Sequence, residues 1–171
     1  MDYRNAFDLA GSIAVVTGGS LGIGFETATA LGACGAKVIL ASRDRKNLDR
    51  SVGKLARAGA DASPFVLDVT DSTAVTRAAD AIVAEHGKVD ILVNSAGIAR
   101  LNSALETPDD EWRAVMDVNV NGMFWCCRAF GRHMVAAGKG AIVNLGSMSG
   151  SSSIARRPRR PTWRAKAPCI C

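Results

Sequence analysis

Residues 13–24 have the sequence IAVVTGGSLGIG, in which a short apolar run leads into a glycine-rich turn. β-Branched residues dominate positions 13–17 and favour a buried strand, and a helical pattern over residues 22–34 begins directly after the turn. Glycines at such a turn let the backbone approach a pyrophosphate, and the N-terminus of the following helix supplies N–H donors and the positive end of its dipole. The stretch therefore predicts a nucleotide-binding turn. The alternative is a turn whose glycines only allow the helix to pack closely on the strand.

The alternation of strand and helix continues along the chain as far as residue 150. Short apolar runs predict further strands at residues 37–41, 65–67, 91–93 and 141–145, and amphipathic stretches predict helices at 44–58, 72–85 and 107–137. Asp71 is expected to cap the third helix and Gly87 to end it. Because strand–helix–strand crossovers are right-handed, we expect an α/β fold in which a doubly wound parallel sheet carries helices on both faces.

The composition changes after Gly150. Residues 151–171 hold six of the 21 Lys and Arg residues but none of the 16 Asp and Glu residues, so the positive net charge of the chain comes from this segment and the rest of the chain carries about −1. Its three prolines and its lack of any strand or helix period predict an unstructured segment. We therefore divide the chain into a dinucleotide-binding domain at residues 1–150 and a basic tail at residues 151–171.

The overall composition excludes several classes of protein. With 48% hydrophobic and 22% charged residues, the chain has the composition of a globular domain and not of a disordered or collagen-like protein. No apolar run approaches the ~20 residues that a membrane span needs, and the N-terminus does not resemble a secretory signal, so a cytoplasmic location is expected. The five cysteines lack C-x-x-C spacing and the two histidines stand apart, so no metal site is expected.

Further motifs follow the other predicted strands in order. The first turn has the spacing T-G-x-x-x-G-x-G, Asp68-Val69 follows the third strand, Asn94-Ser95-Ala96-Gly97 follows the fourth, Asn119 lies in a predicted helix and Ser147 follows the fifth strand. With these motifs, residues 7–150 resemble the short-chain dehydrogenase/reductase family. Taken singly, Asp68 has an alternative explanation as a helix N-cap, Asn94 as a strand-end hydrogen-bonding group, Asn119 as a polar group satisfied within its helix, and Ser147 as a turn serine.

The resemblance implies a fold and a set of site residues. The family has a Rossmann-like sheet of seven strands, of which this chain is expected to carry five. Ser147 and Asn119 are the implied catalytic residues. The residues expected to contact a nicotinamide dinucleotide lie in the glycine turn, at the end of the second strand and after the third and fourth strands: Gly18, Ser20, Gly22, Ile23, Gly24, Ser42, Arg43, Asp68, Val69, Asn94, Ala96 and Gly97.

The end of the second strand bears on the choice of cofactor. Members that prefer NAD place an acidic residue there to accept hydrogen bonds from the ribose hydroxyls. This chain has Ser42 and Arg43 instead, and a guanidinium makes charge-assisted hydrogen bonds to phosphate. We therefore expect NADP(H) to be favoured over NAD(H). Asp44 follows directly and works against this preference, and the alternative for Arg43 is a solvated residue at a helix start.

The stretches ILVNSAGIARL, NVNGMFW and AIVNLGSMSG look most like polyol dehydrogenases of the galactitol type. The resemblance implies hydride transfer between nicotinamide and an alcohol or carbonyl substrate, with a tyrosine in Y-x-x-x-K as general acid and base. The chain has one tyrosine, Tyr3, and none follows Ser147. We therefore expect the chain as written to be inactive.

The basic tail has two explanations. In a shifted reading frame its codons are compatible with a Tyr-x-x-x-Lys segment, so we hypothesise that the tail is translated out of frame and that the strand at residues 141–145 is left as an exposed edge. The alternative function is a non-catalytic nucleotide-binding or interaction module whose basic arm binds nucleic acid or an acidic partner. We favour the first explanation and expect neither a membrane nor a nucleic-acid partner. The resemblance implies homo-oligomers for intact family members, which leaves the assembly of this chain open.

Overall fold

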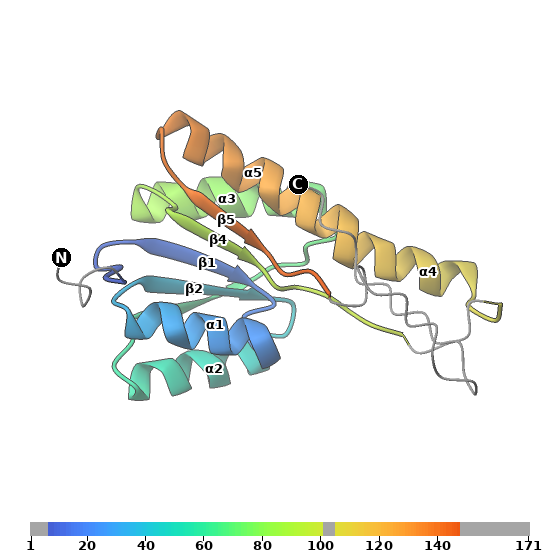
Figure 1. Ribbon diagram of the computed structural model, residues 1–171, viewed down its shortest axis with the longest axis horizontal. Helices are drawn as coiled ribbons and strands as arrows, with labels where there is room; N and C mark the ends of the chain where they lie inside the picture. Colours follow the sequence, from blue (N-terminus) through green and yellow to red (C-terminus); the bar gives the residue numbers. More distant parts are fainter. Residues whose placement is uncertain (1–6, 101–104, 148–171) are drawn as a thin grey trace.

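One parallel sheet forms the centre of the molecule. The computed structural model describes residues 7–100 and 105–147. The sheet has five strands, and Figure 1 shows β5, β4, β1 and β2 side by side. Their order is β3-β2-β1-β4-β5, and each neighbouring pair is parallel. The strands are β1 (Ile13–Thr17), β2 (Lys37–Ser42), β3 (Ala62–Val66), β4 (Ile91–Asn94) and β5 (Ala141–Asn144). The predicted tail at residues 151–171 lies outside the described residues, as does Tyr3.

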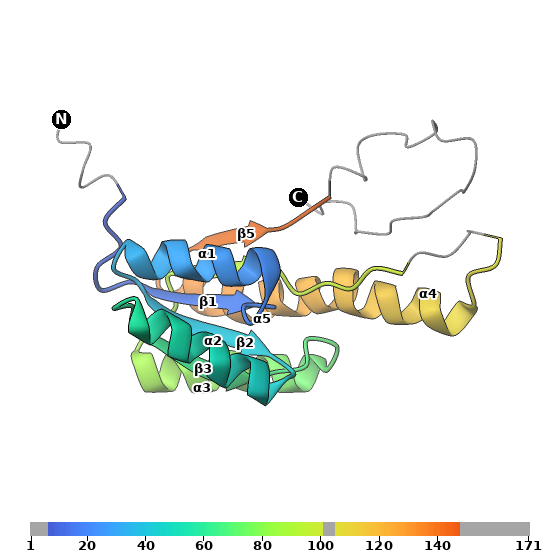
Figure 2. The same cartoon turned by 90° about the horizontal axis from the view of Figure 1, so that it is seen from below.

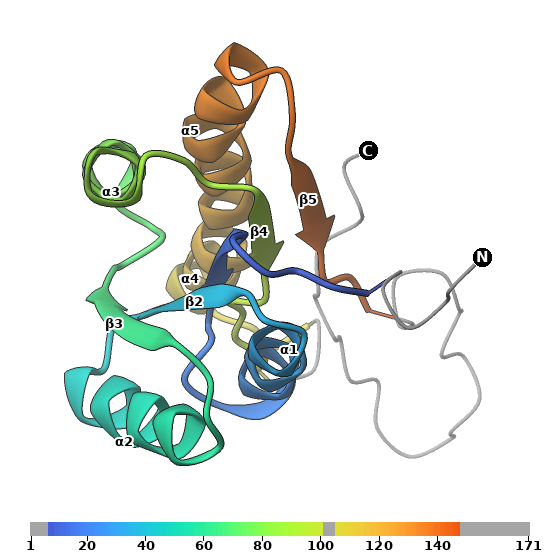
Figure 3. The ribbon, with the colours of Figure 1, turned by 90° about the vertical axis from the view of Figure 1, so that its left-hand side faces the viewer.

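The helices cover both faces of this sheet, which confirms the doubly wound α/β fold. Figure 3 shows α1 and α2 on one side of the strands and α3 and α5 on the other. The chain runs from β1 outward to β3, crosses back over the sheet through α3, and continues outward from β4, so the strand order reverses between β1 and β4. The helices are α1 (Gly22–Ala33), α2 (Arg45–Arg57), α3 (Ser72–His86), α4 (Asp109–Met116), the π-helical segment η2 (Asp117–Gly122) and α5 (Met123–Ala136).

Alternate residues of the central strands supply two separate cores. Val15 packs in the core beneath α3 and α5, which includes the fully buried Phe130. Val16 and Leu40 pack on the opposite face with Leu48 of α2. Since successive side chains of a strand point to opposite faces, a strand that is covered on both sides must be apolar throughout. This double burial explains the unbroken apolar runs of β1 and β2.

The third strand begins earlier than the sequence pattern predicts. The prediction was residues 65–67, but β3 spans Ala62–Val66 and pairs Pro64 with Leu40. Pro64 interrupts the apolar pattern, yet it is tolerated because β3 lies at the edge of the sheet, where one side of a strand needs no hydrogen-bonding partner. Leu67, which we expected within the strand, follows it and is buried.

The predicted helix boundaries at α3 are confirmed. The carboxylate of Asp71 accepts hydrogen bonds from the backbone N–H groups of Thr73 and Ala74, both at 2.9 Å, which satisfies two donors of the first turn. Gly87 ends the helix with φ of 77°, a left-handed conformation that favours glycine. Asp44 caps α2 in the same way by accepting from the N–H of Asn47 at 3.0 Å.

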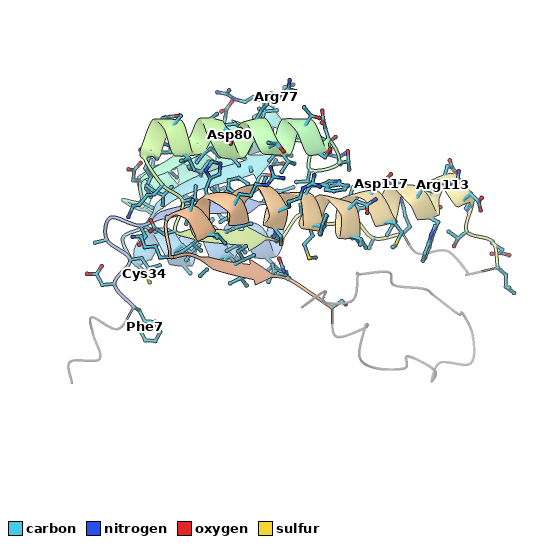
Figure 4. The ribbon with its side chains drawn as sticks, turned by 90° about the horizontal axis from the view of Figure 1, so that it is seen from above. Phe7, Cys34, Arg77, Asp80, Arg113 and Asp117 are labelled. Atoms are coloured by element: carbon cyan, nitrogen blue, oxygen red, sulfur yellow. The ribbon has the colours of Figure 1, made fainter. Side chains whose placement is uncertain are left out.

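The helix predicted at residues 107–137 is present, but its middle is π-helical. It begins at Asp109 after Pro108, and η2 separates α4 from α5. Figure 2 shows α4 extending past the end of the sheet, and Figure 4 labels Arg113 in α4 and Asp117 at the start of η2. No helix within the described ranges combines the length and apolar character needed to cross a membrane.

Strand β5 forms the edge of the sheet opposite β3, as expected for residues 141–145. Within the described chain it pairs only with β4. Its side chains are correspondingly accessible, with Ile142 38% exposed and Val143 48% exposed. An edge strand with exposed apolar side chains is a site at which further strands can add.

Asp90 joins the amino ends of three strands. Its Oδ2 accepts hydrogen bonds from the backbone N–H of Ile13 at 3.0 Å and from Nζ of Lys88 at 2.9 Å. Its Oδ1 lies 3.1 Å from Nζ of Lys139, and its backbone oxygen accepts from the N–H of Ala141 at the start of β5. Burial alone would raise the pKa of this carboxyl, but the hydrogen bonds from Ile13 and the two lysines outweigh burial and lower the pKa below its ordinary value.

Replacing Asp90 with alanine is expected to lower the free energy of unfolding by about 1.5–3 kcal/mol at neutral pH, as for other hydrogen bonds to charged groups. Because the pKa of Asp90 is lower in the folded chain, the stabilisation is present above the unfolded pKa of about 4 and is lost as the pH falls through the folded pKa. Denaturant unfolding followed by circular dichroism should therefore show the difference between wild type and variant narrowing in acid.

Asp61→Ala is the matched control for this experiment. Asp61 pairs with Lys37 at 3.6 Å, but its side chain is 67% exposed. Exposed pairs contribute at most about 1 kcal/mol, so this variant should unfold nearly as wild type does. Equal losses for the two variants would show that Asp90 is an ordinary surface carboxylate.

Candidate functional site

A cavity of about 360 Å³ opens at the carboxyl ends of the central strands. It lies where the strand order reverses between β1 and β4, which is the place where open α/β sheets bind their ligands. Predicted cofactor residues that line it are Gly18, Ser20, Ile23, Ser42, Arg43, Asp68, Val69, Ala96 and Gly97. The structure thus brings together residues from four predicted motifs around one cavity.

The glycine turn packs against the loop that follows β4. Gly18 has φ of 65°, and a Cβ atom there would lie 2.8 Å from the backbone N and Cα of Ala96. A Cβ atom on Gly24 would overlap the carbonyl oxygen of Gly18 and lie 3.0 Å from Oγ of Ser95. Gly22 has φ of 54° with open space around it, so it serves the turn and not the packing. Gly22 and Gly24 shape the turn without lining the cavity.

Hydroxyl groups and a charged pair line the wall at the end of β2. Ser20 donates from Oγ to Oγ of Ser42 at 3.1 Å, and its carbonyl oxygen accepts from the hydroxyl of Ser51 in α2 at 2.8 Å. Nη1 of Arg43 lies 3.9 Å from Oδ2 of Asp68, which joins this wall to the loop after β3. Both charged side chains remain partly exposed, at 62% and 43%, so the pair is loose and accessible.

Asp68 holds the turn after β3 and is not a helix N-cap, which was its alternative explanation. Asp71 caps α3, so Asp68 is not the N-cap. Its Oδ1 accepts from the backbone N–H of Thr70 at 3.0 Å and from the hydroxyl of Thr70 at 2.8 Å. These bonds hold the turn after β3, and the second carboxylate oxygen is the one that faces Arg43.

Asn119 holds the loop after β4 through its side-chain amide. Its Oδ1 accepts from the backbone N–H of Ile98 at 2.8 Å, and its Nδ2 donates to the carbonyl oxygen of Ile98 at 2.9 Å. The other end of this loop is tied to β1, since the N–H groups of Ser95 and Ala96 donate to the carbonyl and hydroxyl oxygens of Thr17. The loop is therefore fixed at both ends.

Asn94 does not line the cavity, and it makes hydrogen bonds at the end of β4, in agreement with its alternative explanation as a strand-end hydrogen-bonding group. Its Nδ2 donates to Oδ1 of Asn144 in β5 at 2.8 Å and to Sγ of Cys127 in α5 at 3.3 Å. Its own Oδ1 is buried without a hydrogen-bonding partner. Burial raises the pKa of the Cys127 thiol, and burial raises that of Cys126 to about 12, so both sulfurs are neutral thiols and not nucleophiles at neutral pH.

Neither predicted catalytic residue, Ser147 or Asn119, lines the cavity, but a near neighbour of each in the sequence does. Ser147 lies in the loop after β5 and is half-buried. Leu145, which precedes it by two positions, lines the cavity and donates its N–H to the carbonyl oxygen of Asn94 at 3.0 Å. Val118, the neighbour of Asn119, lines the cavity from η2.

Several other residues that line the cavity were not predicted from the sequence, and most of them are apolar. In the sequence, an apolar residue that lines a cavity at a strand end looks the same as an apolar residue of the core. Each of the unpredicted lining residues does lie within two positions of a predicted site residue. They are Leu21, Ala41, Leu67, Ser95, Ile98, Val118 and Leu145. Across residues 7–100 and 105–147, no group of three or more His, Cys, Asp or Glu side chains is placed to hold a metal ion.

The family model and the most similar curated proteins that we compared are all dehydrogenases. Residues 12–159 match the family model described as short chain dehydrogenase. The chain is 56% identical to a galactitol 2-dehydrogenase (L-tagatose-forming) of Cereibacter sphaeroides over 93% of this chain and 61% of that protein. It is 42% identical to a galactitol 2-dehydrogenase of Rhizobium johnstonii over 95% of this chain and 62% of that protein. The chain thus spans about three fifths of the length of these curated relatives.

A solved structure extends the comparison to three dimensions. A metagenomic short-chain oxidoreductase in complex with NADP superposes with a TM-score of 0.81 at 36% sequence identity. The superposition covers 86% of this chain and 67% of that protein. Sequence and structure therefore point to the same group of proteins.

Replacing Gly24 with alanine is expected to destabilise the chain by about 1–3 kcal/mol, the usual cost of overpacking, because the added methyl group would meet the Gly18 carbonyl. Gly53→Ala in α2 is the matched control, since nothing lies within 4 Å of a Cβ atom there. That variant should gain roughly 0.5–1 kcal/mol from helix propensity. Denaturant unfolding of both variants measures the difference, and a stabilised Gly24→Ala would refute the close packing.

Proposed function

Since the chain belongs to the short chain dehydrogenase family, we propose that it binds a nicotinamide dinucleotide in the cavity at the ends of β1, β2 and β4. We further propose that it is the cofactor-binding part of an NAD(P)-dependent alcohol or polyol dehydrogenase. The observation that carries the proposal is the glycine turn, because its backbone lies open to the cavity at the start of α1.

The residues of the turn fit a pyrophosphate group. Gly18 and Ser20 line the cavity, and the first N–H groups of α1 have no partners within the helix itself. A helix N-terminus with accessible backbone N–H groups is suited to a phosphate, and bulkier residues at Gly18 or Gly24 would fill the space that the turn needs. A bound dinucleotide would supply the hydride-transfer chemistry, and the chain would supply binding and orientation.

The other predicted residues take their proposed roles from their position around the cavity. Asp68 and Val69 would contact the adenine part, and Ala96 and Gly97 would form the opposite wall. Asn94 would act indirectly, because its amide holds the end of β4 against β5.

The wall at the end of β2 favours NADP(H) over NAD(H). Arg43 and Ser42 line the cavity beside Ser20, so a guanidinium and two hydroxyl groups could donate to a 2′-phosphate. Asp44 does not oppose this proposal, since its carboxylate is used in capping α2. The NADP complex of the metagenomic relative is consistent with the same preference.

The proposed chemistry is incomplete in this chain. Ser147 would hold the substrate oxygen and Asn119 would keep the loop at Ile98 in place for a water-linked proton path. The sequence has a single tyrosine, Tyr3, which precedes β1 and does not form a Tyr-x-x-x-Lys motif. We propose that the 171-residue chain binds the cofactor but transfers no hydride. The two galactitol dehydrogenases among its relatives make a polyol the proposed substrate of the complete activity.

Replacing Arg43 with alanine is expected to weaken NADP(H) binding about 10- to 100-fold, since a hydrogen bond to a charged group contributes roughly 1.5–3 kcal/mol. NAD(H) binding should change less than about threefold, because NAD lacks the 2′-phosphate. Isothermal titration calorimetry with both cofactors measures this difference.

Arg45→Ala is the control for the loss of a nearby positive charge. Arg45 pairs with Asp49 at 2.8 Å on the exposed side of α2, and it does not line the cavity. It should bind both cofactors as wild type does. Failure of the wild type to bind either cofactor would refute the proposed function, whereas equal losses of both cofactors in Arg43→Ala would refute only the preference for NADP(H).

Incubation of the 171-residue chain with galactitol and either oxidised cofactor is expected to give no increase in nicotinamide absorbance above the buffer rate. A parallel calorimetric titration should show cofactor binding in the same sample. Turnover that is abolished by Ser147→Ala would contradict the proposed inactivity and assign the acid–base role to another group.

A further inference from the structure

The π-helical segment η2 contacts two of the loops that line the cavity. Its buried residues are Val118, Asn119 and Gly122. Val118 lines the cavity directly, Asn119 binds the loop after β4, and Gly122 abuts the loop after β3. One helical turn therefore spans the distance between the two loops.

The contact at Gly122 is too close for any side chain. A Cβ atom there would lie 2.7 Å from Cγ2 of Val69, 3.0 Å from its Cβ and 3.1 Å from its backbone oxygen. Since one of these atoms belongs to the backbone, a change of the Val69 rotamer could not relieve the contact. Val69 is itself 7% exposed and lines the cavity.

The glycine is not needed for the conformation of the helix. Gly122 has φ of −60° and ψ of −43°, which every L-amino acid adopts. Alanine is a better helix former than glycine, so the backbone alone would favour alanine at this position. The close approach to Val69 is the remaining reason for glycine.

We propose that Gly122 is a positioning residue that sets the separation between the loop at Asp68-Val69 and the loop at Ser95–Ile98. The inference rests on the proposed function, because the two loops are the walls between which the dinucleotide would lie. A side chain at Gly122 would push Val69 into the cavity or push η2 away from it. In the second case the two hydrogen bonds between Asn119 and Ile98 would stretch, so either response moves a wall of the site.

Gly122→Ala is expected to weaken binding of NADPH and of ADP, a probe of the adenine half, by about tenfold or more, because overpacking of this size would displace a wall of the site. Isothermal titration calorimetry gives both dissociation constants, and thermal unfolding by circular dichroism shows that the variant is folded. Loss of ADP affinity is the specific readout, since destabilisation alone would leave the affinity of the folded molecules unchanged.

Gly131→Ala is the matched control. Gly131 lies in α5 on the same continuous helix, and the nearest atom to a Cβ there is Cδ1 of Ile142 at 3.9 Å, an ordinary van der Waals contact. This variant should bind both nucleotides within about twofold of wild type. Equal losses in the two glycine variants would overturn the proposal.

Val69→Ala in the Gly122→Ala background tests the contact itself. Removing the two γ-methyl groups takes away the closest of the three contacts, so the double variant should regain part of the lost affinity relative to Val69→Ala alone. Gly122→Ala alone could fail to fold, and the double variant then decides. A double variant that folds and binds nucleotide supports the proposal, and a double variant that does not fold overturns it. Wild-type affinity in folded Gly122→Ala also overturns it, whereas a wild type that binds no nucleotide refutes the proposed function instead.

Discussion

The close approach of the Gly18 backbone to Ala96 is the constraint on which the site depends. It brings the first turn against the loop after β4, at the point where the strand order reverses. Gly24 lets α1 pack closely against the same turn, and Thr17 accepts the hydrogen bonds from the backbone of Ser95 and Ala96. The cavity exists because two loops from non-consecutive strands meet without side chains between their backbones. Gly18 therefore allows close packing and also lines the cavity, so the two explanations of the motif do not exclude each other.

The side-chain amides of Asn94 and Asn119 make hydrogen bonds to other parts of the chain and do not line the cavity. Asn119 is bonded in both directions to the backbone of Ile98, and Asn94 joins β4 to Asn144 of β5. The loop that carries Ser147 leaves β5 directly after Asn144, so the second of these hydrogen bonds holds the start of that loop. Buried amides of this kind fix the geometry of a site through the strands and loops that they hold.

Sequence alone predicts the elements whose signals are local. The cap at Asp71, the end of α3 at Gly87 and the strand–turn–helix around Gly18 follow from the chemistry of single residues and are found where expected. The start of β3 was missed, since whether Pro64 is tolerated depends on the edge position of its strand, which is a property of the whole sheet. The partners of Asn119 and the contact at Gly122 were also beyond prediction, because they join residues that are far apart in the chain.

The exposed edge of β5 has a consequence for the rates at which its amide hydrogens exchange with solvent. The N–H groups of Ala141 and Leu145 donate to β4, so in a parallel pair those of Ile142 and Asn144 point away from it. Hydrogen exchange along β5 should therefore alternate from one residue to the next. It should be slow at the amides that donate to β4 and fast at Ile142 and Asn144. Any segment that adds to the edge would slow the fast set alone, and those two amides would report its arrival and its departure.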